Sequence, residues 1–190
     1  NQSMIDLSQY KKIHCIGIGG IGLSAVAEIF CSRGYTVSGS DMKLSDTTAH
    51  LASRGIRIFE GHDAGNIAGA DLIVYSSAIS RENPELLAAR EAGIPAVTRA
   101  EALGALMHDY STSIAVSGTH GKTTTTSMAT HIFMAAQKDP TVMIGGTLQL
   151  LHSGYRVGKG DTIIAESCEY CNSFLSFFPT VAVILNVEAD

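Results

Sequence analysis

No apolar run in this chain approaches the ~20 residues that a transmembrane helix needs, so we expect no membrane partner. The first ten residues carry neither a basic start nor an apolar stretch, which argues against a signal peptide. Basic residues are in the minority, 13 against 18 acidic ones. The resulting formal net charge of -5 argues against a general nucleic-acid binder. The remaining composition, with 45% hydrophobic residues, is typical of a globular protein rather than a disordered one.

Cysteine is also scarce, and the four cysteines do not form the pattern of a disulfide-rich domain. We therefore expect a reduced, cytoplasmic location. Cys168 and Cys171 form a C-x-x-C pair, but a structural zinc site usually takes four ligands, and the nearest histidine is His152. The sequence favours ordinary thiols and leaves any role of this pair open.

Short β-branched runs alternate with helical stretches along the chain, which is typical of βαβ units and a parallel sheet. In a first domain, residues 1–109, we predict strands at 12–17, 36–40, 57–59, 71–75 and 96–98 and helices at 21–33, 46–54, 84–91 and 99–108. In a second domain, residues 110–190, we predict strands at 113–117, 141–144, 162–165 and 180–185 and one helix from 122 to about 137.

The first glycine-rich loop follows the first predicted strand and opens a helix. Gly17, Gly19 and Gly22 match G-x-G-x-x-G, and Asp41 follows at roughly the ~20 residues expected for a ribose contact. Glycines let the backbone approach a phosphate, and the helix N-terminus offers free N–H groups. The pattern predicts a pyrophosphate site. It does not say which nucleotide diphosphate binds, and a tight turn without a ligand is the plain alternative.

The second loop follows the strand at 113–117 and runs Gly118-Thr119-His120-Gly121-Lys122-Thr123-Thr124. It resembles a Walker loop, although Val116 stands where the full pattern would have glycine. In such a loop the backbone N–H groups cradle phosphate, Lys122 supplies a cation, and the Thr123 hydroxyl is placed to bind Mg²⁺. A lysine at a helix N-terminus is unfavourable without an anion, because the helix dipole there is already positive.

Together the loops predict an α/β protein: a Rossmann-like parallel-sheet domain followed by a truncated P-loop-type α/β domain. Two loops of different types indicate two phosphorylated ligands. Because four strands and one helix are few for a nucleotide-triphosphate domain, we expect the chain to be a fragment of a longer protein.

The stretch from Ser117 to Thr125 resembles the ATP loop of the Mur ligases, the bacterial ATP-dependent amide-forming enzymes of peptidoglycan precursor synthesis. Further agreement lies at 17–22, 39–41, 76–80, 83–85, 99–101, 145–146, 165–166 and 186–190. The resemblance is strongest to the branch that joins L-alanine to UDP-N-acetylmuramate. It implies a third domain that this chain does not include, and therefore an inactive fragment. It leaves a homo-oligomer open.

The resemblance also implies a set of site residues. UDP-sugar binding would fall on Gly17, Gly19, Gly20, Ile21, Gly22, Ser40, Asp41, Ser76, Ser77, Ala78 and Arg99. ATP binding would fall on Gly118, Thr119, His120, Gly121, Lys122, Thr123 and Thr124. Lys122, His120 and Glu166 would be catalytic, and Thr123 and Glu166 would hold Mg²⁺. Many relatives have a further acid after Glu166 where this chain has Ser167 and Cys168, so only Glu166 is carried over and Glu169 is not.

In the reaction that the resemblance implies, the lactyl carboxylate of UDP-N-acetylmuramate attacks the γ-phosphate of ATP. The amino group of L-alanine then displaces phosphate from the acyl phosphate. Three alternatives stay open: a recycling ligase that attaches a tripeptide to the same UDP-sugar, a non-catalytic UDP-sugar-binding module, and an NAD-dependent oxidoreductase. The oxidoreductase leaves Lys122 and Glu166 unexplained.

Overall fold

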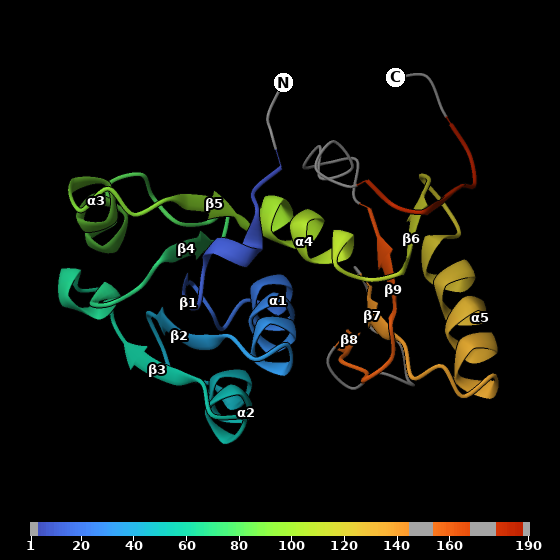
Figure 1. Cartoon of the computed structure of the whole chain (residues 1–190), viewed down its shortest axis with the longest axis horizontal. Coiled ribbons are helices and arrows are strands. Elements are labelled where there is room, and N and C mark those ends of the chain that lie inside the picture. Colours follow the sequence, from blue (N-terminus) through green and yellow to red (C-terminus); the bar gives the residue numbers. More distant parts are fainter. Residues whose placement is uncertain (1–3, 145–153, 168–177, 188–190) are drawn as a thin grey trace. The chain divides into compact units, whose positions relative to one another are not determined.

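The computed structural model describes residues 4–144, 154–167 and 178–187 of the 190-residue chain. The chain divides into two compact units, the first comprising Ile5–Ala102 and the second continuing from Leu103. Each unit is built on its own five-stranded sheet (Figure 1). The predicted α/β class is therefore confirmed.

The sheet of the first unit is entirely parallel, with the strand order β3-β2-β1-β4-β5. Its strands are β1 (Lys12–Ile16), β2 (Thr36–Asp41), β3 (Arg57–Glu60), β4 (Leu72–Tyr75) and β5 (Ala96–Thr98). β2 and β3 lie on one side of β1, and β4 and β5 lie on the other, so the strand order reverses at β1. An open α/β sheet binds ligands outside the carboxyl ends of its strands at such a switch point.

The connecting helices are α1 (Ile21–Ser32), α2 (Asp46–Ser53), α3 (Pro84–Glu91) and α4 (Arg99–His108). Two 3₁₀ turns, η1 (Leu7–Gln9) and η2 (Ala64–Ile67), were not predicted. Such turns are too short to carry a hydrophobic period. The central strand β1 is buried from Ile13 to Ile16, as expected of a parallel strand covered on both faces. Ile16 belongs to a buried cluster with Ile67, Ile73 and Ala89.

The second unit contains β6 (Thr112–Ser117), α5 (Lys122–Ala135), β7 (Thr141–Met143), β8 (Tyr155–Arg156), β9 (Thr162–Glu166) and β10 (Val181–Ile184). Its strand order is β10-β6-β9-β7-β8, and only the β7–β8 pair is antiparallel. The two-residue strand β8 was not predicted. The core lies around β6 and β9, where Ile114, Val116, Val142, Ile144 and Ile164 pack together.

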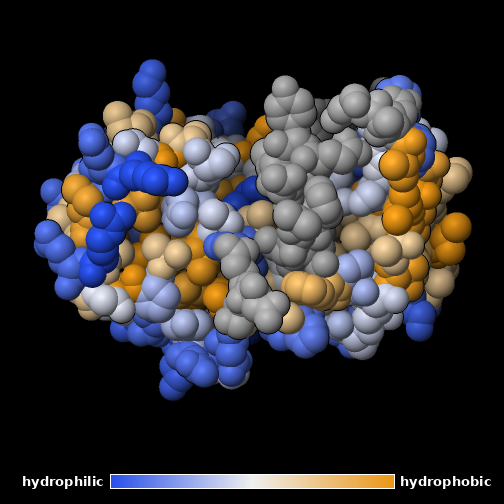
Figure 2. Space-filling view, turned by 90° about the horizontal axis from the view of Figure 1, so that it is seen from above, coloured by the Kyte–Doolittle hydropathy of each residue, from blue (hydrophilic) through white to orange (hydrophobic). Residues whose placement is uncertain are grey.

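Hydrophobic side chains are also exposed at the surface (Figure 2). On the second unit these include Met128 and Ile132 of α5 and Ile184 of the edge strand β10. Within the described ranges, no helix is both long enough and apolar enough to cross a bilayer.

Gly39 sets how closely the first loop packs on β2. A Cβ atom at Gly39 would lie 2.4 Å from Ile18 Cδ1 and 2.8 Å from the carbonyl oxygen of Cys15. We expect Gly39→Ala to lower the free energy of unfolding by about 1–3 kcal/mol, because overpacking of a rigid backbone is destabilising. Urea denaturation measures this. Gly20→Ala is the matched control, since its Cβ would meet only the Gly17 carbonyl at 3.4 Å. A Gly39→Ala protein as stable as the wild type would contradict this account of the packing.

Candidate functional site

The first glycine-rich loop joins β1 to α1 at the carboxyl edge of the first sheet, and the end of β2 holds it in place. The backbone N–H groups of Gly17 and Ile18 donate to the Ser40 carbonyl oxygen at 2.8 and 3.0 Å. The Gly19 N–H donates to Asp41 Oδ2 at 2.8 Å. Gly17 has φ of +82°, a conformation that favours glycine. Three consecutive N–H groups thus fix the first half of the loop.

The second half of the loop offers N–H groups to a ligand. The Gly20 N–H donates to the Gly17 carbonyl at 3.1 Å, and Gly20 caps α1 without a side-chain hydrogen bond. Ile21 and Gly22 occupy the first turn of α1, where N–H groups have no intrahelical partner. No described residue accepts a hydrogen bond from either of them. These N–H groups lie at the positive end of the helix dipole, where an anion is favoured.

Several predicted residues from distant segments meet at this loop. A Cβ atom built on Gly22 would lie 2.8 Å from Arg99 Cδ, so the Arg99 side chain runs beside the open end of the loop. A Cβ on Gly17 would lie 3.3 Å from Ser76 Cβ, which follows β4. Ser77 and Ala78 lie in the exposed turn beyond, where the Ala78 N–H donates to Ser76 Oγ at 3.3 Å. The cluster combines open N–H groups with a guanidinium group, which suits an anion.

The second loop joins β6 to α5. Gly118 and Gly121 have φ of +145° and +84°, and Gly121 caps α5. The Lys122 ammonium donates to the Gly118 carbonyl, so the lysine side chain curls back over its own loop. The positive charge of Lys122 therefore lies beside the backbone of its own loop. The His120 residue is exposed.

Glu166 is the last residue of β9, and it pairs with Val116 in the neighbouring parallel strand β6. Because parallel strands end at the same edge, Glu166 is placed at the edge from which the second loop leaves. Thr123 lies in the first turn of α5 and is half-buried. Carboxylate and hydroxyl oxygens are suitable Mg²⁺ ligands, so these two residues fit that metal. The described part of the chain has no cluster of three or more His, Cys, Asp or Glu side chains that could hold a metal unaided.

Asn186 contacts the second loop, but the sequence analysis assigned it no role. Its Oδ1 accepts from the Thr119 N–H at 2.6 Å and from Thr119 Oγ1 at 2.7 Å. Its Nδ2 donates to the His120 carbonyl at 3.1 Å. Asn186 follows β10, the neighbour of β6, and only its place in the resembling stretch 186–190 could have drawn attention to it.

The first unit contains two cysteines, Cys15 and Cys31, which are both free. Burial raises the pKa of the Cys15 thiol to about 12, so it stays protonated. Cys31 is a free, partly buried cysteine of α1. Cys168 and Cys171 lie outside the described residues, as do Glu169 and the pair at 145–146.

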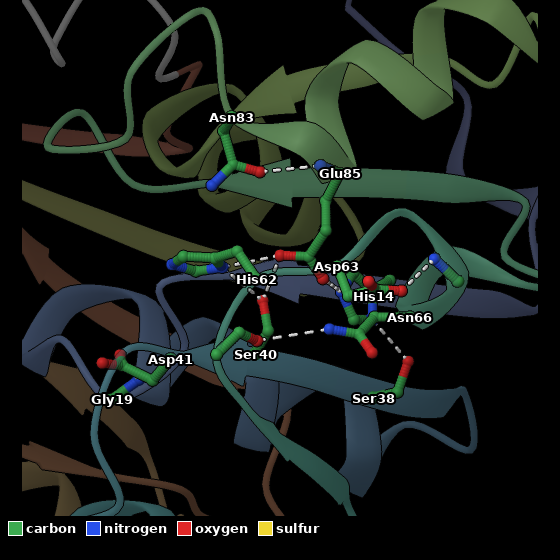
Figure 3. A network of polar contacts seen from close by, with 12 residues as sticks. His14, Gly19, Ser38, Ser40, Asp41, His62, Asp63, Asn66, Asn83 and Glu85 are labelled. Atoms are coloured by element: carbon green, nitrogen blue, oxygen red, sulfur yellow. Dashed lines mark hydrogen bonds and ion pairs between the residues drawn. The ribbon is translucent and has the colours of Figure 1, made fainter.

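A buried polar network lies behind the first loop and was not predicted (Figure 3). Glu85 Oε1 is 2.8 Å from His14 Nε2, and Glu85 Oε2 is 2.6 Å from both Ser40 Oγ and His62 Nδ1. The side chains of His14 and Glu85 are fully buried, and that of His62 is 11% exposed. Burial by itself raises the pKa of Glu85, but the hydrogen bonds from His14, Ser40 and His62 outweigh it, so the pKa lies below its ordinary value.

Comparison with known protein families finds a match over about half of the chain. The model described as "Mur ligase family, catalytic domain" matches residues 12–111 of this chain.

Curated relatives match nearly the whole chain. A protein of Agathobacter rectalis named UDP-N-acetylmuramate--L-alanine ligase is 54% identical over 187 residues, which is 98% of this chain and 41% of the relative. A protein of Clostridium novyi with the same name is 51% identical over 180 residues, 95% of this chain and 39% of the relative. The chain thus spans about two fifths of the length of these curated relatives.

Solved structures agree with the fold. The UDP-N-acetylmuramate-alanine ligase of Thermotoga maritima is 38% identical with a TM-score of 0.77, covering 91% of this chain and 40% of that one. A UDP-N-acetylmuramate:L-alanyl-gamma-D-glutamyl-meso-diaminopimelate ligase from Neisseria meningitides is 29% identical with a TM-score of 0.80, covering 95% of this chain and 62% of that one.

The lowered pKa of Glu85 predicts how stability depends on pH. A carboxyl group whose pKa is lower in the folded state contributes stability above its unfolded pKa, and loses it as the pH falls through the folded value. The unfolded value is near 4.5. Urea denaturation between pH 7 and pH 3 should therefore show the wild type losing its advantage over Glu85→Gln below about pH 4.5. At pH 7 we expect that advantage to exceed about 1.5 kcal/mol, because hydrogen bonds to a charged group are lost. A difference that stays constant with pH would show that folding does not lower the pKa of Glu85.

Proposed function

The chain belongs to the Mur ligase family, and on that premise we propose that it forms the UDP-sugar-binding and ATP-binding parts of a UDP-N-acetylmuramate–L-alanine ligase. Residues 1–109 would bind the UDP-sugar, and residues 110–190 would supply part of the ATP site. The observation that carries the proposal is the presence of two glycine loops of different types, each at the carboxyl edge of its own sheet. Relatives named for this activity align with 95–98% of the chain, so both loops lie within the shared region.

At the first loop, the open N–H groups of Ile21 and Gly22 and the guanidinium group of Arg99 are suited to a pyrophosphate. Asp41 Oδ2 accepts the Gly19 N–H at 2.8 Å, and Oδ1 accepts the Lys43 N–H at 3.4 Å. Each carboxylate oxygen can accept more than one hydrogen bond, so Asp41 can also bind the nucleoside side of the ligand. Gly17, Gly20, Ser40, Ser76, Ser77 and Ala78 complete the proposed UDP-sugar site.

At the second loop, residues 118–124 would cradle the phosphates of ATP. Lys122 would neutralise charge on the γ-phosphate as the lactyl carboxylate attacks it. Thr123 and Glu166 would hold Mg²⁺, which when bound supplies a second positive charge to the transferring phosphoryl group. His120, exposed on the loop, is placed to reach the carboxylate or the phosphate.

The chemistry explains why two anion sites are needed. A carboxylate is a poor acyl donor, so the γ-phosphoryl group is transferred to it and ADP leaves. The amine of L-alanine then attacks the acyl carbon, loses a proton and displaces inorganic phosphate to form the amide. Both anions must approach each other, which makes the lysine and the metal the main electrostatic contributors.

A tripeptide-attaching recycling ligase is the second candidate. The Neisseria meningitides structure of that kind is 29% identical, against 38% for the alanine ligase of Thermotoga maritima and 50% or more for curated alanine ligases. Identity therefore favours L-alanine as the second substrate.

The first ligand is tested by titration calorimetry on this chain. We expect UDP-N-acetylmuramate to bind and NAD not to bind. Arg99→Ala should weaken UDP-sugar binding about 10- to 100-fold, because a charge-assisted contact with the pyrophosphate is worth about 1.5–3 kcal/mol. Arg90→Ala, an exposed arginine of α3, is the control. Tighter binding of NAD than of the UDP-sugar would refute the assignment of the first loop.

The second ligand is tested with Lys122→Ala. ATP binding in the presence of Mg²⁺ should weaken by about 10- to 100-fold, while the affinity for UDP-N-acetylmuramate should not change. Lys138→Ala removes an exposed lysine just after α5 and should leave both affinities unaltered. If Lys122→Ala weakened UDP-sugar binding and spared ATP, the ligands of the two loops would have to be exchanged.

A further inference from the structure

We propose that Glu85 is a positioning residue of the UDP-sugar site: its buried carboxylate fixes Ser40, and Ser40 in turn fixes the backbone of the first glycine loop (Figure 3). The inference rests on the proposed function, because it takes the first loop as the UDP-sugar site. Glu85 itself is fully buried and does not reach the ligand.

The first step is the placement of Glu85. Asn83 caps α3, and its Oδ1 accepts the Glu85 N–H at 2.9 Å. Pro84 stands at the first helical position, where its fixed φ suits the start of a helix. Glu85 therefore lies in the first turn of α3, where the helix dipole stabilises a negative charge. The sequence Asn83-Pro84-Glu85 thus sets the backbone position of this carboxylate.

The second step is what the carboxylate holds. One oxygen accepts from His14 Nε2 of β1, and the other accepts from Ser40 Oγ of β2 and His62 Nδ1, which follows β3. Ser38 Oγ lies 2.8 Å from the other ring nitrogen of His14, so that ring is held from both sides. Through one buried group, α3 is thus tied to β1, to β2 and to the residue beyond β3.

The third step links this network to the loop. The Ser40 hydroxyl donates a hydrogen bond to Glu85, and the Ser40 carbonyl accepts hydrogen bonds from the N–H groups of Gly17 and Ile18 in the loop. Asp41, the next residue, accepts the Gly19 N–H. Ser40 is held by the pairing of β2 with its neighbouring strands and, in addition, by the hydrogen bond from its hydroxyl to Glu85. The Glu85–Ser40 hydrogen bond therefore restrains the residue whose carbonyl anchors two of the three loop N–H groups.

The consequence concerns ligand affinity. The open N–H groups of Ile21 and Gly22 can meet a pyrophosphate only if the anchored half of the loop is in place. Misplacing binding groups by about 1 Å can cost on the order of a hundredfold, even when the altered residue lies far from the ligand. We therefore expect loss of the Glu85 carboxylate to weaken UDP-sugar binding at least tenfold.

The test uses this chain with Glu85→Gln and two readouts. Calorimetry with UDP-N-acetylmuramate should show the tenfold or greater loss. Amide hydrogen exchange should accelerate more at Gly17 and Ile18 than at the central β4 residues Ile73 and Val74, whose exchange reports the general loss of stability. Glu91→Gln is the matched control, an exposed glutamate at the other end of α3.

Ser40→Ala is the second variant, because it keeps the contacts of Glu85 with His14 and His62 and removes the contacts of the buried Ser40 hydroxyl with Glu85 and His62. If Glu85→Gln does not fold, the Ser40→Ala variant provides the test of the proposal. Affinity within twofold of wild type, with exchange at Gly17 and Ile18 that accelerates no more than exchange at Ile73 and Val74, would overturn the inference. If the wild-type chain does not bind the UDP-sugar, the proposed function is wrong. The exchange measurement would still test whether Glu85 holds the loop in place.

Discussion

A glycine loop can present N–H groups to a phosphate only if something else holds it, because it has few side chains of its own for packing. The rest of this structure depends on that constraint. In the first unit the end of β2 provides the anchor, through the carbonyl of Ser40 and the carboxylate of Asp41. In the second unit Asn186 binds the Thr119 and His120 backbone, and Lys122 closes over the Gly118 carbonyl. In both units part of the anchor comes from the strand next to the one that leads into the loop, or from a residue shortly after that strand.

The two sites differ in the charge that the protein contributes. The first loop has a carboxylate at its anchored half and a guanidinium group at its open half, Asp41 and Arg99. The second has a lysine inside the loop and a carboxylate, Glu166, on the neighbouring strand. A carboxylate beside a phosphate is tolerable when a divalent cation lies between them. This difference supports our proposal of a pyrophosphate site in the first unit and a magnesium-dependent triphosphate site in the second.

Much of the fold could be predicted from the sequence, for physical reasons. Buried parallel strands are short apolar runs, and β1, β5 and α3 begin where the sequence indicates. Local signals also mark helix starts, as Asn83 and Pro84 do for α3. The elements missed, η1, η2 and β8, are too short to have a period. The Glu85 network was missed because its members come from positions 14, 40, 62 and 85, and only the tertiary fold makes them neighbours. Asn186 was missed for the same reason.

The most direct test of the two-loop account is the amide spectrum of this chain, assigned by NMR and titrated with UDP-N-acetylmuramate and then with ATP and Mg²⁺. The account predicts two separate sets of shifted amides. The UDP-sugar should move those of Ile21, Gly22 and their neighbours in the first loop, and ATP should then move those between Gly118 and Thr124. If both ligands shifted amide signals of the same loop, or if the UDP-sugar shifted only those of the second loop, the assignment of one ligand to each unit would be contradicted.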